Sequence, residues 1–312
     1  MSKPPLLLSF GYGHAATSPL AYTLARSNKY CHFGYTKQIN YIEGIVKCLG
    51  VTHHQDRQPR NWTSTILTLL KDERWENYNS FTGHKMNLTS DYDVIRDFPV
   101  THAEKYLSYF TVQKYIDFNT ALWEHIEPQG YKSVGDFSQN KYEHVPVDHP
   151  KVIKVFKQLQ EHLDIKALVI VRDPIRRAWG QYSAIRAKGK IEQLRHFCYL
   201  HEYDRITNLL GKENCHMVVM EELWEGNGDE KDKLSEFLNY PIRSLWKNLY
   251  SPDRGHLVSY DPEVPCQSYG QNLELTHDTY MMLKDHFQYV YDNWQSRFGT
   301  LPLHWGTPIN YV

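Results

Sequence analysis

The chain has 312 residues, of which 41% are hydrophobic, so it is long enough to bury a large core. Its 35 Lys and Arg residues almost balance its 36 Asp and Glu residues, and this balance excludes binding to nucleic acid through a general positive charge. The N-terminal apolar run at 6–10 is much shorter than a signal-peptide core or a membrane span. We therefore expect a soluble, cytoplasmic protein with no membrane or nucleic-acid partner, and the sequence leaves its oligomeric state open.

The cysteines and histidines do not form a recognisable metal-binding pattern. The five cysteines are widely spaced and include no Cys-x-x-Cys pair, which predicts reduced thiols that lie mostly in the core. Among 17 histidines only His53 and His54 are adjacent, and no acidic residue or cysteine completes a ligand spacing around them. We therefore expect no metal.

The N-terminal region predicts a strand, a loop of small residues and a helix. Leu6–Phe10 reads as a buried strand, and a helix is expected from about Pro19 to Ser27. The short side chains between them let the backbone approach a ligand, and two hydroxyls are placed to cap the helix. This loop suits a phosphate or sulfate group, or it is an ordinary tight connection; its residues are Gly13, His14, Ala15, Ala16, Thr17 and Ser18. It is not a Walker A loop, because Ala16 and Thr17 stand where that motif has glycine and lysine.

The next part of the chain is expected to add two strands and a helical insertion. Tyr30–Phe33 predicts a second strand, followed by a helix that ends near Cys48. Residues 51–130 are predicted to be a mostly helical insertion that forms a wall of an acceptor pocket, with helices at Trp62–Leu70 and Thr101–Ile126. A third strand at Lys132–Ser138 ends in polar residues.

The most informative stretch is a strand, turn and helix at 167–185. Five apolar residues at 167–171 predict a strand buried on both faces, and Asp173 and Pro174 are favourable at the N-cap and first position of a helix. A core-facing stripe in the helix comprises Ile175, Ala178, Trp179, Tyr182 and Ile185, whereas Arg176, Gly180 and Ser183 lie on another face. Arg172 is placed at the carboxyl end of a central strand, where open α/β sheets bind anions, although a basic surface turn is the alternative.

The C-terminal part continues the alternation of helices and strands. We expect a helix at about Ile191–Leu210, a strand at His216–Met220 that ends at Glu221 and Glu222, and a short helix at about Lys231–Leu238. A last helix at His277–Phe298 gathers six large residues on one packing face: Tyr280, Leu283, Phe287, Val290, Tyr291 and Trp294. The alternation predicts an α/β fold in which helices cover both faces of a mainly parallel central sheet. Because no linker divides the chain, we expect a single domain over 1–312.

Several of these segments resemble the sulfotransferases that use 3′-phosphoadenosine-5′-phosphosulfate (PAPS), in particular the carbohydrate and bacterial types. Val171-Arg172-Asp173-Pro174 is similar to the Arg-Asn/Asp-Pro turn that binds the 3′-phosphate in that family, and residues 13–18 look like a degenerate copy of its phosphosulfate loop. Gly135-Asp136-Phe137-Ser138 is similar to the family's Gly-Glu/Asp-x-Ser-Pro strand end, and Met220-Glu221-Glu222-Leu223 to its Glu-Asp-Leu segment. Leu301-Pro302-Leu303-His304-Trp305 resembles a common C-terminal ending. The motifs occur in the family's order over most of the chain.

The resemblance implies a P-loop-like three-layer fold and transfer of a sulfuryl group from PAPS to a hydroxyl or amine, on a small-molecule or carbohydrate acceptor. The nucleotide product would be adenosine-3′,5′-bisphosphate (PAP), and no metal is required. The implied cofactor-binding residues are Gly13, His14, Ala15, Ala16, Thr17, Ser18, Arg172, Gly180, Ser183, Arg254 and Gly255. Lys37, Gln38, His14 and Asp136 are the residues implied for catalysis, with Lys37 and His14 as cations that stabilise the bridging and sulfuryl oxygens.

Four departures from the family's motifs change this picture. His14 stands where the phosphosulfate loop has lysine or arginine, and Gly180 stands where the second motif has serine, a loss for which Ser183 is placed to compensate. Gln38 and Asn40 replace the glutamate and histidine of the family's Lys-Glu-x-His segment. Because an amide cannot take a proton from the acceptor, we expect the base to be Asp136 first and His14 second. The alternative for Asp136 is that it caps a helix or a turn.

Two other functions remain open at this point. The first is a sulfotransferase-like nucleotide-binding protein with weak or no catalysis, which the replacements at Gln38, Asn40 and Gly180 favour. The second is a P-loop-type phosphotransferase, which the absence of a Walker lysine and of a convincing strand-end aspartate for Mg²⁺ disfavours.

Overall fold

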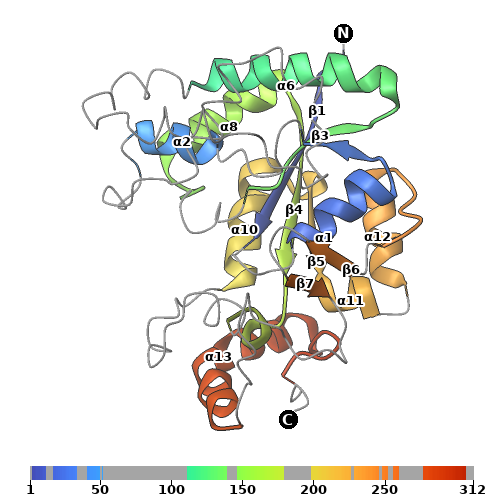
Figure 1. Ribbon diagram of the computed structural model, residues 1–312. Coiled ribbons are helices and arrows are strands. Elements are labelled where there is room, and N and C mark those ends of the chain that lie inside the picture. The colour runs from blue at the N-terminus through green and yellow to red at the C-terminus, as the bar shows by residue number, and fades with distance from the viewer. Residues whose placement is uncertain are drawn as a thin grey trace, which may run out of the picture. The chain divides into compact units, whose positions relative to one another are not determined.

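The computed structural model describes residues 2–11, 17–33, 41–49, 51, 111–138, 146–178, 198–225, 228–245, 248–251, 256–259 and 277–306. Five of the described strands form a parallel sheet in the order β2-β3-β1-β4-β5 (Figure 1). The strands are β1 Pro5–Gly11, β2 Cys31–His32, β3 Ser133–Asp136, β4 Asp164–Val171 and β5 Cys215–Val219. A separate antiparallel pair is formed by β6 Asn248–Ser251 and β7 His256–Ser259.

Helices alternate with the strands of the parallel sheet along the chain, so the α/β prediction is confirmed. The α-helices are α1 Thr17–Tyr22, α2 Tyr41–Cys48, α6 Val112–Ile126, α8 Pro150–His162, α10 Tyr199–Leu210, α11 Met220–Glu225, α12 Asp229–Leu238 and α13 His277–Phe298. A π-helix at Thr23–Ser27 continues α1, and short 3₁₀ turns occupy Glu127–Gln129 and Lys212–Asn214. The predicted helix at 62–70 and the first parts of those at 101–126 and 191–210 lie outside the described residues.

The chain divides into two compact units, each assembled from segments that are distant in the sequence. Unit 1 comprises Met1–Phe10, Lys29–Leu168 and Ile206–Cys215, and unit 2 comprises Gly11–Asn28, Val169–Arg205 and His216–Val312. The expected single domain over 1–312 stays a prediction.

In unit 1, helix α8 packs against the central strand β1. The rings of Phe156 in α8 and Phe10 in β1 lie 6.4 Å apart between centroids, and both are fully buried. Strand β1 pairs with β3 in parallel, with Leu6 opposite Val134 and Leu8 opposite Asp136. This register places Asp136, the last residue of β3, opposite Leu8 in the middle of β1.

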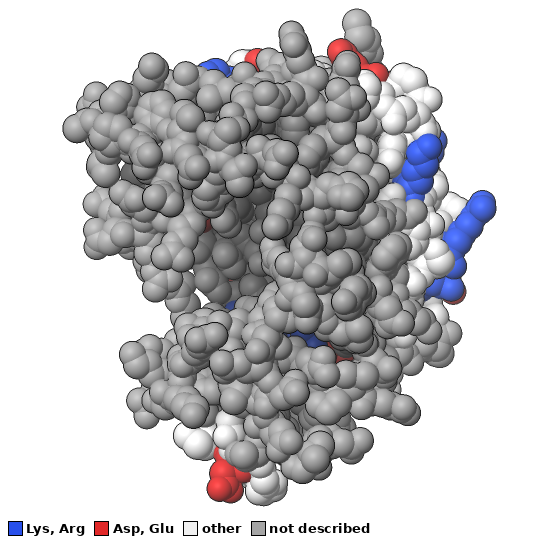
Figure 2. Space-filling model, in the orientation of Figure 1, with Lys and Arg blue, Asp and Glu red and all other residues white. Residues whose placement is uncertain are grey.

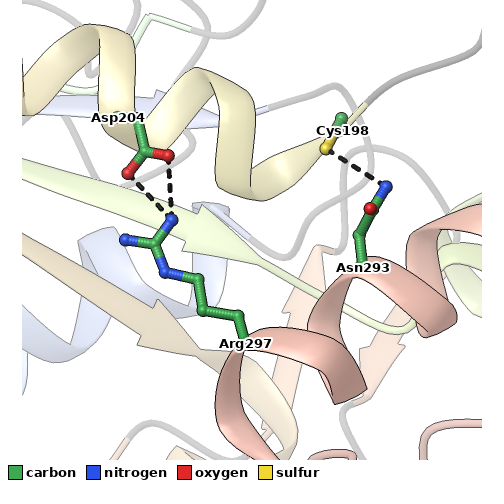
Figure 3. A network of polar contacts seen from close by, with 4 residues as sticks. All are labelled: Cys198, Asp204, Asn293 and Arg297. Atoms are coloured by element: carbon green, nitrogen blue, oxygen red, sulfur yellow. Dashed lines mark hydrogen bonds and ion pairs between the residues drawn. The ribbon is translucent and has the colours of Figure 1, made fainter.

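Unit 2 is built around helix α13 and the C-terminal turn. The six large residues predicted to share one face of α13 are the ones that the helix buries, so that prediction is confirmed. The exposed side of the helix is joined to α10, where Arg297 contacts both carboxylate oxygens of Asp204 at 2.9 and 2.8 Å (Figure 3). Close by, the Asn293 amide lies 3.9 Å from the Cys198 sulfur (Figure 3).

Some elements differ from the prediction. Helix α11 starts directly at Met220, so Glu221 and Glu222 lie in a helix rather than at the end of a strand. The β6–β7 pair was not predicted from the sequence. Cys31 and Cys215 are buried free thiols, as predicted, and Cys198 is partly exposed.

The described surface carries charges of both signs. The face drawn in Figure 2 shows both basic and acidic side chains among the described residues. This mixture agrees with the net charge of −1. Within the described ranges, no helix has the length and apolar character needed to cross a membrane. The same residues include no group of three or more His, Cys, Asp or Glu side chains suited to a metal ion.

Gly135 is required by the packing of Phe33. A Cβ atom built on Gly135 would lie 2.7 Å from Cδ1 of the Phe33 ring, which itself packs edge-on against Phe137 with 5.0 Å between centroids. We predict that Gly135→Ala lowers the free energy of unfolding by about 1–3 kcal/mol, because the buried ring has to shift. Urea denaturation measures this, and Gly130→Ala is a useful comparison because its Cβ would meet no atom within 4 Å, although its φ of 91° adds backbone strain. Equal stability of Gly135→Ala and the wild type would contradict the packing argument.

Candidate active site

The turn after strand β4 is stabilised by the side chain of Asp173. The described helix that follows the turn runs over 174–178, and the Arg176 backbone N–H donates to Asp173 Oδ1 at 2.8 Å. This is the hydrogen bond of an N-cap, so the predicted capping role of Asp173 is confirmed. The stripe residues Ile175 and Ala178 are buried as predicted.

The second carboxylate oxygen of Asp173 bonds to residues far along the chain. The Tyr291 hydroxyl of α13 donates to Asp173 Oδ2 at 2.9 Å, and the Gly306 backbone N–H donates to the same oxygen at 3.0 Å. Asp173 is only 2% exposed. A capping side chain that is normally half-solvated is here fully enclosed and bonded to the C-terminal part of the chain.

A second carboxylate, Glu221, holds the backbone of the same turn. The Asp173 backbone N–H donates to Glu221 Oε1 at 3.1 Å, and the Trp305 indole N–H donates to Glu221 Oε2 at 3.0 Å. At the other end of the same peptide group, the Tyr199 hydroxyl donates to the Arg172 carbonyl at 2.7 Å. Both polar groups of the Arg172–Asp173 peptide bond are therefore fixed by buried side chains.

The charges in this region balance in part. Burial raises the pKa of Glu221 above its ordinary value, the positive charge of Arg172 opposes that rise, and the Asp173 carboxylate adds to it. Burial, and next the charge of Asp173, raise the pKa of Tyr291, so its hydroxyl keeps its proton and acts as a donor at neutral pH. The half-buried Arg172 and the buried Arg177 supply positive charge among these carboxylates.

The end of strand β1 lies next to the end of strand β4. The two strands are neighbours in the sheet, and a Cβ atom built on Gly11 would lie 3.4 Å from both Ile170 Cβ and Thr17 Cγ2. Thr17 starts helix α1 and is buried. Gly11, the last residue of β1, therefore lies beside the strand that leads to Arg172, at the carboxyl ends of these strands, where open parallel sheets bind ligands.

In unit 1, Asp136 ends strand β3 in a fully buried position. The Tyr115 hydroxyl of α6 donates to Asp136 Oδ2 at 2.8 Å, and Oδ1 accepts the backbone N–H of Ser138 at 3.0 Å together with the Ser138 hydroxyl. The Tyr115 ring stacks on Tyr41 with 5.1 Å between centroids. Burial, and next the Asp136 charge, raise the pKa of Tyr115, so this hydroxyl also remains a donor. Both oxygens of Asp136 thus have donors from the protein itself.

Comparison with solved structures places this architecture among known folds. The sulfotransferase from Alicyclobacillus acidocaldarius matches with a TM-score of 0.50 over 96% of this chain and 98% of its own, at 12% sequence identity. The chain has the sulfotransferase fold. The sulfotransferase domain of the Synechococcus PCC 7002 olefin synthase matches 93% of this chain and 96% of its own with a TM-score of 0.44, at 13% identity. That of the curacin biosynthetic pathway matches 92% of this chain and 99% of its own with a TM-score of 0.39, at 12% identity. No protein-family model and no curated protein sequence matches the chain.

Within this sulfotransferase fold, the predicted site residues fall into three groups. Arg172 and Thr17 lie in unit 2 at the ends of β4 and β1, and Asp136 lies in unit 1 at the end of β3. For Ser18 the structure describes the helical backbone alone. Outside the described residues lie Gly13, His14, Ala15, Ala16, Lys37, Gln38, Gly180, Ser183, Arg254 and Gly255.

Sequence reasoning missed the residues that surround the Arg172 turn. Tyr291 was predicted as a core residue of α13, but its hydrogen bond to Asp173 joins positions 118 residues apart, and no local pattern reports such a contact. Tyr199 and Tyr115 were likewise not assigned a polar role. The available signal was indirect, since a buried tyrosine usually finds a partner for its hydroxyl.

We predict that Tyr115→Phe destabilises unit 1, because the buried Asp136 carboxylate loses one donor. The expected loss is about 1.5–3 kcal/mol of unfolding free energy, the range for a hydrogen bond to a charged group. Chemical denaturation measures it, with Tyr131→Phe as a control at a partly exposed tyrosine of the same unit. If both variants lose the same amount, the Tyr115–Asp136 bond contributes nothing specific.

Proposed function

We propose that this chain is a sulfotransferase that moves a sulfuryl group from PAPS to a hydroxyl or amine of a small-molecule or carbohydrate acceptor. The observation that carries the proposal is the Arg172 turn at the carboxyl end of β4. The Arg172–Asp173 peptide group of this turn is held at its N–H and at its carbonyl by hydrogen bonds with Glu221 and Tyr199, and the turn is similar to the family's 3′-phosphate motif. The sulfotransferase fold supports it. A soluble, cytoplasmic location belongs to the same proposal.

The proposed binding mode follows from the strand ends. The 5′-phosphosulfate is held by the backbone of 13–18, after β1, and the 3′-phosphate is gripped bidentately by Arg172, after β4. Ser183 supplies the hydroxyl that Gly180 lacks. Arg254 and Gly255 close over the nucleotide.

The proposed chemistry is an in-line displacement at sulfur. The acceptor oxygen or nitrogen forms a bond to sulfur, the bond between sulfur and the bridging oxygen of the 5′-phosphate breaks, and PAP leaves with that oxygen. Lys37 and His14 neutralise the negative charge that develops on the bridging and sulfuryl oxygens. A base takes the proton of the acceptor, and the scheme uses no metal.

The contacts of Asp136 bear on the choice of base. A base has to come within hydrogen-bonding distance of the acceptor proton, whereas both oxygens of Asp136 already accept hydrogen bonds from Tyr115 and Ser138. We therefore propose that Asp136 positions Ser138 at the end of β3. His14 is then the leading candidate for proton transfer, since Gln38 cannot accept a proton.

A second candidate function is nucleotide binding without catalysis. It is favoured by Gln38 and Asn40, which replace the ionisable residues of the family's catalytic segment. Two experiments separate the candidates. Isothermal titration calorimetry measures the affinities for PAPS, PAP and ATP, and an assay with radiolabelled PAPS measures sulfuryl transfer to phenols, alcohols and amines. Tight binding of PAP with no transfer supports the second candidate, and a preference for ATP contradicts both.

The central prediction is that Arg172→Ala weakens PAP binding by about 1.5–3 kcal/mol, because one charge-assisted contact to the 3′-phosphate is lost. Calorimetry measures the change. Arg243→Ala is the matched control, because Arg243 is exposed in the same unit and its backbone N–H, not its guanidinium, contacts Asn28. Unchanged PAP affinity in Arg172→Ala would remove the proposed 3′-phosphate site.

We further predict that His14→Gln lowers kcat by about 10²–10⁴ and removes the acidic limb of the pH–rate profile, as expected for loss of a general base. Asp136→Asn is expected instead to reduce unfolding free energy while the folded enzyme keeps its pH–rate profile. Transfer assays over pH 5–9 and denaturation of both variants make the comparison. If Asp136→Asn is stable yet loses turnover, and His14→Gln keeps it, then Asp136 is the base after all.

A further inference from the structure

Two buried carboxylates, those of Asp173 and Glu221, bond to the Arg172 turn. Of their four oxygens, only Asp173 Oδ1 caps the helix that follows the turn. Asp173 Oδ1 caps the helix, whereas Asp173 Oδ2 and both oxygens of Glu221 bond to other groups. Asp173 is 2% exposed and Glu221 is 0% exposed. A buried carboxylate is costly unless each oxygen meets a donor, and two of them in one place repel each other.

The donors that make this arrangement tolerable come mainly from the C-terminal part of the chain. Asp173 Oδ2 accepts from the Tyr291 hydroxyl and the Gly306 N–H, and Glu221 Oε2 accepts from the Trp305 indole N–H. The turn therefore depends on Tyr291 of α13 and on the segment 301–306. We call Tyr291 and residues 301–306 together the C-terminal clamp.

The clamp has a defined shape that presents these donors. His304 and Gly306 have left-handed φ angles of 62° and 69°. In this segment the Trp305 indole N–H donates to Glu221, and the Gly306 backbone N–H donates to Asp173. The Trp305 ring packs against Trp294 at 4.6 Å between centroids, and the Tyr280 hydroxyl donates to the Gly306 carbonyl at 2.7 Å. Both partners lie on the buried face of α13, so the helix fixes the clamp.

The Leu303 backbone N–H adds one more bond to helix α11, because it donates to Glu222 Oε1 at 2.7 Å. Neighbouring residues of α11, Glu221 and Glu222, thus hold two points of the clamp. A misplaced clamp would break both bonds and leave Glu221 without the donor to one of its buried oxygens.

We propose that Tyr291 and Trp305 are positioning residues for anion binding at Arg172, acting through Asp173 and Glu221. This inference rests on the proposed function, because it concerns the site assigned there to the 3′-phosphate. The clamp holds Glu221, which fixes the N–H of the Arg172–Asp173 peptide group, and Asp173, which caps the following helix. Less conformational freedom is therefore lost when the Arg172 guanidinium binds a phosphate. Neither residue touches the nucleotide, and their effect is confined to the 3′-phosphate.

The test measures the affinities for PAP and for adenosine-5′-phosphate in two variants. One variant lacks the Tyr291 hydroxyl, and the other lacks the Trp305 indole N–H. In Tyr291→Phe and Trp305→Phe, which keep the aromatic packing, PAP affinity is expected to fall roughly 3- to 20-fold, a part of the full value of a hydrogen bond to a charged group. Affinity for adenosine-5′-phosphate, which lacks the 3′-phosphate, is expected to change less than about twofold. Calorimetry at a temperature where both variants are folded measures both ligands.

Two control variants remove contacts of unit 2 that do not reach the turn. Arg297→Gln breaks the exposed pair between α13 and α10 that Figure 3 shows, and Tyr240→Phe removes a hydroxyl that donates to the Asn28 carbonyl. Both controls are expected to keep the PAP affinity of the wild type. Amide hydrogen exchange gives a second readout without ligand, because exchange at Asp173 and Arg176 is expected to be faster in Tyr291→Phe and Trp305→Phe than in the controls.

The outcomes separate the inference from the proposed function. A wild-type protein that does not bind PAP contradicts the proposed function, and the exchange measurement still reports whether the clamp holds the turn. A wild type that binds PAP, with unchanged affinity in Tyr291→Phe and Trp305→Phe, overturns the inference alone. Equal losses for PAP and adenosine-5′-phosphate also overturn it, because they indicate a general loss of structure.

Discussion

The hydrogen bonds of the Asp173 carboxylate are the constraint on which the candidate site depends. One oxygen starts the helix after β4, and the other joins that helix to α13 and to the C-terminal turn through Tyr291 and Gly306. Because a buried carboxylate tolerates no missing donor, the strand end, the helix start and the C-terminal segment have to form together. The position of Arg172 is thereby set by residues more than a hundred positions away.

Buried tyrosines satisfy the polar groups at two strand ends of the parallel sheet. Strands β3, β1 and β4 are successive neighbours in that sheet. The polar residues at these ends are then satisfied by helices that pack nearby: Tyr115 of α6 serves Asp136, and Tyr199 of α10 serves the Arg172 carbonyl. In each case a buried tyrosine supplies a donor that the strand end lacks.

Local sequence patterns predicted the helices and strands, but they did not predict the hydrogen bonds between residues that are far apart in the sequence. The apolar run at 167–171, the cap at Asp173 and the buried face of α13 each follow from spacing or residue type within one segment, and each is confirmed. The hydrogen bond from Tyr115 to Asp136 could not be derived in that way, because Tyr115 lies 21 residues earlier and on another element. Helix α11 was missed for a related reason, since the helix begins immediately where β5 ends and no turn residue marks the boundary.

The Arg172 turn is held by residues to which the proposed scheme gives no part in the chemistry. Among the described residues, Glu221 and Asp173 are bonded to Tyr291, Trp305 and backbone groups. In the proposed function, anion binding at this turn and proton transfer are therefore separate properties. Turnover in this protein would thus assign proton transfer to a group other than Gln38, and tight PAP binding without turnover would mean that the turn has persisted after the base was lost.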